Sequence, residues 1–268
     1  MAPSLEVTHP VTTELDLTSD DFAVEPWAYP GVPLARSAVL FRGRLHDLDH
    51  GRVGDRRPTL DEFLRNADAA GVEERTLVVA VGSNASPVVT HRKFAGGGVS
   101  TTVPMVTATL RGVGVGHSAH VGLRGFIAAA PVVKHGAPTR VTVSMLDSRQ
   151  LDRLDATEPN YVRKTLDARQ FGLELDGGAS PDECSIYVSK WNVLAEQGSA
   201  SEAMAFQRQE VVYTTLLTKS DELRNLFATD DYRDAMRAAA AKPELREVIP
   251  ALLEREGLTT ASGFEAKK

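Results

Sequence analysis

The stretch of sequence that decides the fold reads Val78-Val79-Ala80-Val81-Gly82-Ser83-Asn84-Ala85-Ser86-Pro87. Its opening residues favour a β-strand, and the small and polar residues that follow cannot continue one. Gly82 allows backbone angles that are closed to other residues, and Ser83 and Asn84 can hydrogen-bond locally and turn the chain. Successive N–H groups in such a turn often point into one concavity and bind an anion or a carboxylate. The pattern predicts a strand that ends in a candidate binding loop, although an ordinary structural turn has the same composition.

A second informative segment contains Leu154-Asp155-Ala156-Thr157-Glu158-Pro159. Asp147 and Gln150 form the pattern of a capping box, so a short helix is expected to begin just before this segment. The proline ends the helix and biases Glu158 toward an extended conformation. The next strand is expected from Tyr161 onward. Glu158 is therefore predicted at a corner between a helix and a strand, where the alternative interpretation is an ordinary solvated carboxylate.

Taken together, the two segments resemble the gamma-glutamylcyclotransferase-like family. Its members carry a Tyr-Gly-Ser-Asn loop directly after their first strand, and later a Leu-Asp-x-x-Glu segment followed by a Tyr-x-Arg strand start. Here Gly82-Ser83-Asn84 matches the loop, residues 154–158 match the acidic segment, and Tyr161-Val162-Arg163 matches the strand start. The matching region covers about residues 75 to 192, which is less than half of the chain.

Two positions depart from the family pattern. Val81 stands where the family usually has tyrosine, and Pro159 stands where it often has glycine. Loss of the tyrosine removes a hydroxyl and an aromatic face from beside the substrate, so this departure concerns the substrate more than the fold. Pro159 restricts the corner and leaves the Glu158 carboxylate in place.

The resemblance implies an enzyme that cleaves a gamma-glutamyl or related amide and releases 5-oxoproline and an amine. In that reaction the α-amine of the substrate attacks its own γ-carbonyl, so the protein has to hold the substrate folded and move protons. Glu158 matches the catalytic glutamate of the family and is the implied general acid/base. The implied substrate-binding residues are Val81, Gly82, Ser83, Asn84 and Tyr161. Neither a metal nor an organic cofactor is implied.

Two other classes of function stay open at this point. A non-catalytic module that binds a small molecule or a protein would explain the missing tyrosine and the long segments on both sides of the matching region. An amide hydrolase or an acyltransferase would keep the fold and the acid/base residue and change the reaction.

The order of the elements predicts an α+β protein. Apolar runs that favour strands fill the middle of the chain, and glycine-rich turns separate several of them. These runs cover residues 77–81, 103–115, 121–133, 140–146, 161–171 and 184–191. About six such strands with one helix between them predict a small, closed or half-closed, mainly β barrel with flanking helices.

Segments of different character lie on both sides of these strands. The expected domains are an extended N-terminal arm over 1–57, a barrel domain with a leading helix over 58–192, a helical C-terminal extension over 193–256 and a flexible tail over 257–268. A capping-box pattern at Thr59 and Glu62 predicts the leading helix. Because large apolar side chains rarely stay exposed together, Trp27, Tyr29 and the stripe from Val211 to Leu226 are expected to pack on the barrel or across a subunit interface.

Composition argues against several classes of partner. The chain has 268 residues, of which 42% are hydrophobic and 25% charged, which is enough to bury a full core. Its formal net charge of −6 argues against binding nucleic acid, which requires a basic surface. No stretch approaches the roughly 20 apolar residues that span a bilayer. The N-terminus lacks a signal-peptide pattern, so no membrane partner and a cytoplasmic location are expected. The expected partner is a small-molecule amide, and the oligomeric state, including a dimer, stays open.

Other residues that could carry chemistry favour structural roles. Cys184 is the only cysteine and lies on an alternating strand pattern, which predicts a buried thiol. His117 and His120 have a helical ligand spacing but lie among strands, so a metal site is not expected there. The glycine-rich run from Gly112 to Gly116 lacks the Gly-x-Gly-x-x-Gly spacing of a dinucleotide loop.

Overall fold

The computed structural model describes residues 5–50, 58–167, 170–196, 199 and 201–264. Its contacts divide the chain into two compact units, each built from three segments. The first unit comprises Met1–Ser19, Val32–Val113 and His135–Tyr187, and the second comprises Asp20–Gly31, Gly114–Lys134 and Val188–Lys268. Helices and strands form both units, so the expected α+β class is confirmed. The domain boundaries expected at residues 57, 192 and 256 stay a prediction.

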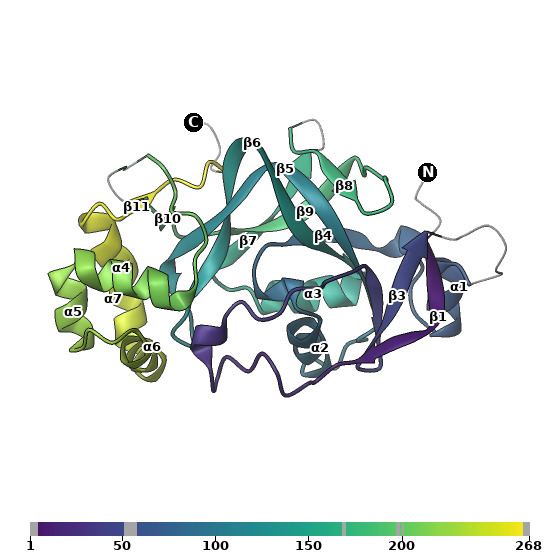
Figure 1. Cartoon of the computed structure of the whole chain (residues 1–268), viewed down its shortest axis with the longest axis horizontal. Coiled ribbons are helices and arrows are strands. Elements are labelled where there is room, and N and C mark those ends of the chain that lie inside the picture. Colours follow the sequence, from purple (N-terminus) through teal and green to yellow (C-terminus); the bar gives the residue numbers. More distant parts are fainter. Residues whose placement is uncertain (1–4, 51–57, 168–169, 197–198, 200, 265–268) are drawn as a thin grey trace. The chain divides into compact units, whose positions relative to one another are not determined.

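The strands of the first unit belong to a sheet that pairs in the order β1-β3-β2-β5-β6-β4-β9-β7, with β8 also paired to β5 (Figure 1). Strands β5, β6 and β9 also have residues in the second unit. The strands are β1 (Leu5–Glu14), β2 (Ala38–Phe41), β3 (Arg44–His50), β4 (Thr76–Ala80), β5 (Val103–Val121), β6 (Ile127–Leu146), β7 (Tyr161–Asp167), β8 (Leu173–Leu175) and β9 (Glu183–Ser189). Within the described residues no pairing joins β1 to β7, the two ends of this order. The sheet is therefore open, and a closed barrel is not confirmed.

Strand β4, which leads into the candidate loop, lies inside the sheet. It pairs antiparallel with β6 and parallel with β9. Val78 and Val79 are neighbours whose side chains point to opposite faces, and both are buried. Both faces of the sheet are thus covered at this strand, which explains why its sequence is continuously apolar instead of alternating.

The observed strands differ from the expected ones in two places, at β6 and in the N-terminal region. The runs over 121–133 and 140–146 do not form separate strands, because β6 continues from one into the other. Gly136 lies between the two runs and adopts a φ of 80°, a conformation that glycine takes without strain, so the strand continues through it. The region expected to be an extended arm supplies β1, β2 and β3, and Leu40 of β2 pairs with Val103 of β5.

Three helices belong to the first unit: α1 (Leu60–Asn66), α2 (Pro87–Ala95) and α3 (Ser148–Ala156). Both expected capping boxes are present, because Thr59 accepts from the Glu62 N–H and Asp147 accepts from the Gln150 N–H. Helices α2 and α3 contact each other (Figure 1). Phe94 of α2 and Leu154 of α3 are buried in one hydrophobic cluster with Val78 of β4. This cluster fixes both helices on the strand that leads into the loop.

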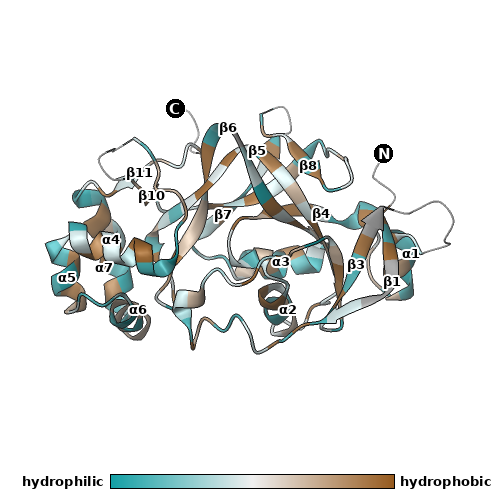
Figure 2. Cartoon of the chain, in the orientation of Figure 1, coloured by the Kyte–Doolittle hydropathy of each residue, from teal (hydrophilic) through white to brown (hydrophobic). Residues whose placement is uncertain are grey.

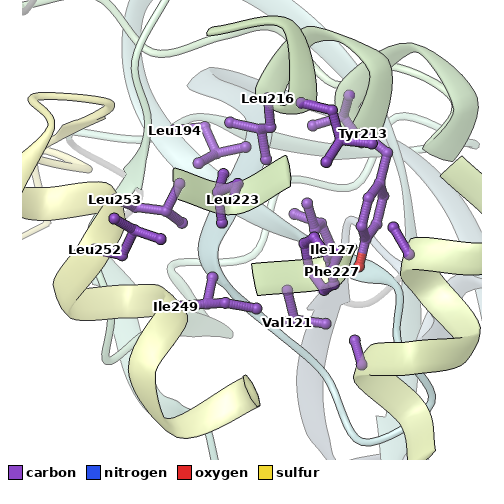
Figure 3. Close-up of a cluster of buried hydrophobic side chains, with 14 of the residues drawn as sticks. Val121, Ile127, Leu194, Tyr213, Leu216, Leu223, Phe227, Ile249, Leu252 and Leu253 are labelled. Atoms are coloured by element: carbon purple, nitrogen blue, oxygen red, sulfur yellow. The ribbon is translucent and has the colours of Figure 1, made fainter. Parts of the chain in front are cut away.

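Helices dominate the second unit, as the periodicity of its sequence predicts. They are α4 (Gln209–Lys219), α5 (Asp221–Phe227), α6 (Tyr232–Ala241) and α7 (Pro243–Arg255), and the short strands β10 (Val193–Leu194) and β11 (Thr259–Thr260) pair beside them. Their buried sides meet in a hydrophobic cluster (Figure 3) that includes Tyr213, Leu216, Leu223, Phe227, Ile249 and Leu253. Figure 2 shows hydrophilic and hydrophobic residues mixed along these helices, as expected for helices that bury one side. Among the described helices, none has the length and apolar character needed to cross a membrane.

Aromatic residues near the N-terminus pack within the second unit. The Tyr29 ring is stacked on Phe126 with 4.2 Å between ring centroids, and its hydroxyl accepts the Ala129 N–H at 2.9 Å. Trp27 packs against the helical cluster. Within the stripe from Val211 to Leu226, Leu217 is buried and Val211 is 45% exposed, so packing of Val211 across a subunit interface stays a prediction.

We expect Leu217→Ala to lower the free energy of unfolding by about 2–5 kcal/mol, because truncation leaves a cavity in the cluster. Leu217 is 3% exposed, whereas Val211 on the same helix is 45% exposed. Val211→Ala should change the free energy of unfolding by no more than about 0.5 kcal/mol. Denaturant unfolding of both variants measures the difference, and equal losses would contradict the burial of this side of α4.

Candidate functional site

The loop after β4 forms a single tight turn. Residues Ser83–Ala85 adopt a 3-10 helix in which the Ala85 N–H donates to the Gly82 carbonyl at 2.9 Å and the Ser86 N–H donates to the Ser83 carbonyl at 3.0 Å. At the start of such a helix the earlier N–H groups have no acceptor within the turn. The backbone N–H groups of Gly82, Ser83 and Asn84 are therefore the ones that this turn could offer to a bound carboxylate.

Helix α2 begins directly after the turn. The Ser86 hydroxyl accepts the Val89 N–H at 3.3 Å, and a proline occupies the first helical position, where its fixed φ suits a helix. The Thr90 hydroxyl donates to the Asn84 carbonyl at 3.2 Å and ties the turn to the helix. Because side chains on a helix point toward its N-terminus, Lys93 on this helix extends back toward the turn.

Glu158 lies at the corner between α3 and β7, as predicted. The helix ends at Ala156, and the Glu158 N–H donates to the Asp155 carbonyl at 3.1 Å. The Tyr161 N–H then donates to the Glu158 carbonyl at 3.0 Å and closes a tight turn that enters the strand. Two backbone hydrogen bonds, one on each side in the chain, thus hold Glu158 in place.

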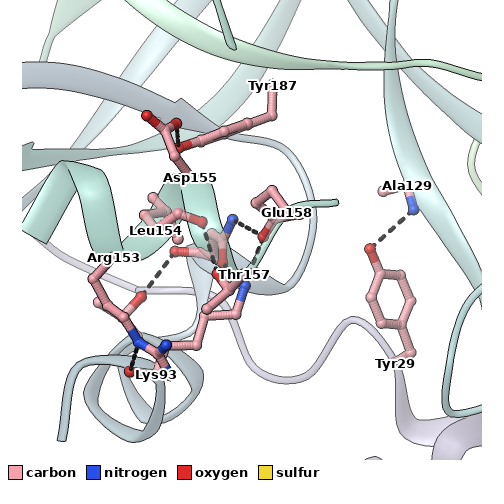
Figure 4. A network of polar contacts seen from close by, with 11 residues as sticks. Tyr29, Lys93, Ala129, Arg153, Leu154, Asp155, Thr157, Glu158 and Tyr187 are labelled. Atoms are coloured by element: carbon pink, nitrogen blue, oxygen red, sulfur yellow. Dashed lines mark hydrogen bonds and ion pairs between the residues drawn. The ribbon is translucent and has the colours of Figure 1, made fainter. Parts of the chain in front are cut away.

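Three polar side chains meet between these elements. Glu158 Oε1 accepts a hydrogen bond of 2.9 Å from Asn84 Nδ2 and one of 2.6 Å from Lys93 Nζ (Figure 4). Lys93 Nζ also donates to Asn84 Oδ1 at 2.7 Å, which closes the triangle. The side chains of Lys93 and Glu158 are only 20% and 13% exposed. The structure thus brings two predicted residues, Asn84 and Glu158, together and adds Lys93, which the sequence analysis did not identify.

Arg153 fixes the end of α2 to α3. Its Nε donates to the Lys93 carbonyl at 3.0 Å (Figure 4). A Cβ atom at Gly97 would lie 2.1 Å from that nitrogen, so only glycine leaves room for the arginine. This contact holds the backbone of the lysine that reaches Glu158.

A second polar cluster lies at the C-terminal end of α3. Asp155 accepts hydrogen bonds from Arg163 Nε at 3.0 Å and from the Tyr187 hydroxyl at 2.6 Å. Burial acts to raise the pKa of Asp155, but the bonds from Arg163 and Tyr187 outweigh it and hold the pKa below its usual range. Burial, together with the nearby carboxylates, raises the pKa of Tyr187, so its hydroxyl stays a donor.

For the remaining predicted residues a role in substrate binding stays a prediction. Val81, Gly82 and Ser83 are half-buried around the turn. Tyr161 is half-buried as well and packs against the hydrophobic cluster of the first unit. In the sequence, Ser86-Pro87 is a helix-start signal that places Lys93 on a helix. No local signal identifies Tyr187, because its partner Asp155 is distant in sequence.

The residues expected to be structural are buried. Burial raises the pKa of the Cys184 thiol to about 11, which confirms a buried thiol. Burial lowers the pKa of both His117 and His120 to about 4. His117 Nε2 accepts the Gln207 N–H at 2.8 Å, and His120 Nδ1 shares a hydrogen bond with the Ser118 hydroxyl. In the described ranges, no three His, Cys, Asp or Glu side chains are grouped as a metal ion would require.

No protein-family model and no curated protein sequence matches the chain. Among solved structures it is similar to one named gamma-glutamyl cyclotransferase, with 12% identity, a TM-score of 0.37 and coverage of 72% of this chain and 93% of that chain. It is also similar to a protein from Arabidopsis thaliana, with 21% identity, a TM-score of 0.35 and coverage of 55% and 85%. For YkqA from Bacillus subtilis the identity is 13%, the TM-score 0.34 and the coverage 84% and 71%. One of these structures has the name of the family that the two motifs resemble, and at these values no activity follows from the likeness.

We expect Asp155→Asn to lower the free energy of unfolding at neutral pH by on the order of 1 kcal/mol, since the ion pair with Arg163 is partly exposed. The folded pKa of Asp155 lies below the unfolded value of 3.8. Its stabilising contribution is therefore complete above the unfolded value and is lost as the pH falls through the folded pKa. Denaturant unfolding from neutral to acid pH should show the two proteins converging. Glu174→Gln, at an exposed residue of β8, is the control, and a constant difference down to low pH would contradict the role of the charge.

Proposed function

We propose that the protein cleaves a gamma-glutamyl or related amide by intramolecular attack of the substrate's α-amine, releasing 5-oxoproline and an amine. The observation that supports this best is the contact between Glu158 and Asn84, which places a carboxylate 2.9 Å from the loop that would hold the substrate. The two groups come from separate motifs, 74 residues apart in the chain. A cyclising reaction needs a binding loop and an acid/base group within the length of one small substrate.

The turn holds the substrate folded. Its backbone N–H groups bind the α-carboxylate, and the absence of a side chain at Gly82 permits close approach. We place Val81, Gly82, Ser83, Asn84 and Tyr161 against the substrate. Because the reacting amine and carbonyl belong to one molecule, the protein supplies no nucleophile. Good orientation of such groups can lower the barrier by about 7–11 kcal/mol.

Glu158 transfers the proton. Within the described residues both hydrogen bonds to its carboxylate end on Oε1, so Oε2 is the oxygen that faces the reaction. The α-ammonium gives a proton to this oxygen and becomes a neutral amine, whose lone pair forms the bond to the γ-carbon while the carbonyl electron pair moves to its oxygen. When the carbonyl re-forms and the bond from that carbon to the leaving nitrogen breaks, the proton passes from Glu158 to the departing amine, and the second proton of the attacking nitrogen is released to water. A positioned carboxylate contributes about a hundred- to ten-thousand-fold in rate in this way.

A non-catalytic binding module is the second candidate, and one observation favours it. The Glu158 carboxylate already has a cationic partner in Lys93, at 2.6 Å. A paired carboxylate of this kind can recognise a ligand without any reaction. The two functions differ in whether 5-oxoproline is released.

We expect Glu158→Gln to lower kcat by at least about a hundredfold, because the amide keeps the size of the side chain and cannot accept the proton. Substrate binding should weaken less than kcat falls, since the turn still holds the α-carboxylate when the charge of Glu158 is lost. Release of 5-oxoproline from a panel of gamma-glutamyl amides measures kcat, and thermal shift with the same panel measures binding.

Glu174→Gln is the matched control for this experiment, because Glu174 is an exposed carboxylate on β8. It should leave both measurements unchanged. An active Glu158→Gln protein would remove this residue from the mechanism. Thermal stabilisation of the wild-type protein without release of 5-oxoproline would favour the binding module.

A further inference from the structure

The proposed site contains a pair of opposite charges in direct contact. Lys93 Nζ and Glu158 Oε1 are 2.6 Å apart, and both side chains are largely buried. A pair in this environment is weakly screened by water, so each of its charges acts strongly on a ligand placed beside it. The pair is neutral as a whole, which decides what kind of ligand it can accept.

Each member of the pair keeps hydrogen-bonding capacity for a ligand. A lysine ammonium has three donors, and the described contacts use two of them, toward Glu158 and Asn84. The carboxylate of Glu158 accepts both of its described bonds on Oε1, which leaves Oε2 as an acceptor. One cationic donor and one anionic acceptor therefore lie side by side at the turn.

We propose that Lys93 is the residue that recognises the substrate's α-carboxylate, so that discrimination between acyl groups with and without this carboxylate depends on the Lys93 ammonium. The ammonium of the substrate binds Glu158 Oε2, and its carboxylate binds the third donor of Lys93 beside the backbone N–H groups of the turn. Four charges of alternating sign then form a ring. The inference rests on the proposed function and deepens it by naming the feature of the substrate that the site requires.

The charge arrangement explains why both groups are needed. A ligand with only the ammonium adds a positive charge next to Lys93, and a ligand with only the carboxylate adds a negative charge next to Glu158. Like charges in a partly buried site repel each other. A zwitterionic ligand meets an opposite charge at each end and leaves the site neutral, so among these charged ligands it is the one that binds without uncompensated charge.

Asn84 positions the lysine for this task. Its side-chain amide donates to Glu158 and accepts from Lys93, so both charges are held by the same residue of the turn. The backbone carbonyl of Lys93 is held in turn by Arg153. The ammonium group is thus fixed beside the N–H groups to which the α-carboxylate is assigned.

The test compares L-γ-glutamyl-p-nitroanilide with 4-aminobutyryl-p-nitroanilide, which keeps the reacting amine and lacks the α-carboxylate. We expect the wild-type protein to prefer the first by about ten- to a hundredfold in kcat/KM, the range of one charged hydrogen bond. Lys93→Met should bring this ratio close to one, mainly through KM, and Lys93→Arg should restore part of it. Glutaryl-p-nitroanilide, which lacks the amine, should inhibit the wild-type protein weakly.

The outcomes separate the inference from the proposed function. If the wild-type protein releases both p-nitroaniline and 5-oxoproline and Lys93→Met lowers kcat/KM equally for both substrates, the lysine only supports Glu158 and the inference is wrong, while the proposed function stands. If the wild-type protein turns over neither substrate, both are wrong. Lys242→Met, at an exposed lysine of the second unit, is the control and should leave the ratio unchanged.

Discussion

The ion pair between Lys93 and Glu158 is the interaction on which the candidate site depends. It joins two residues that are 65 positions apart in the chain, and Asn84 bonds to both of them. A largely buried charge is costly unless it is paired and hydrogen-bonded. Each of these three side chains therefore needs the other two, and the turn, α2 and the corner after α3 have to lie together for the site to exist.

The hydrophobic cluster that packs against α2 and α3 keeps the Lys93–Glu158 pair rigid, which the two charges alone would not do. Phe94 follows Lys93 directly in α2 and is fully buried, so the helix cannot rotate without exposing it. Leu154 anchors α3 in the same cluster, against Val78 of β4. The strand that enters the loop and the helices that carry the charges thus share one hydrophobic core. Substrate recognition of the kind proposed needs this rigidity, because a zwitterion is distinguished only if the two charges keep their separation.

The two carboxylates at the end of α3 differ in their hydrogen bonds, and this difference suits them to different roles. Asp155 is held by Arg163 and by the Tyr187 hydroxyl, which ties the helix end to β7 and β9. Glu158, one turn later, is bonded on a single oxygen within the described residues. Two acidic residues in one short segment therefore differ in what remains available: Asp155 braces the corner, and Glu158 keeps an oxygen for a ligand.

The sequence by itself determined the local features of this protein. The capping boxes at Thr59 and Asp147 and the corner at Glu158 were predicted correctly, because each depends on residues within a few positions of one another. Only the tertiary structure decided the open order of the sheet, the continuity of β6 through Gly136 and the meeting of Lys93 with Glu158. These features depend on which distant segments become neighbours, and the composition of each segment carries no information about its partner.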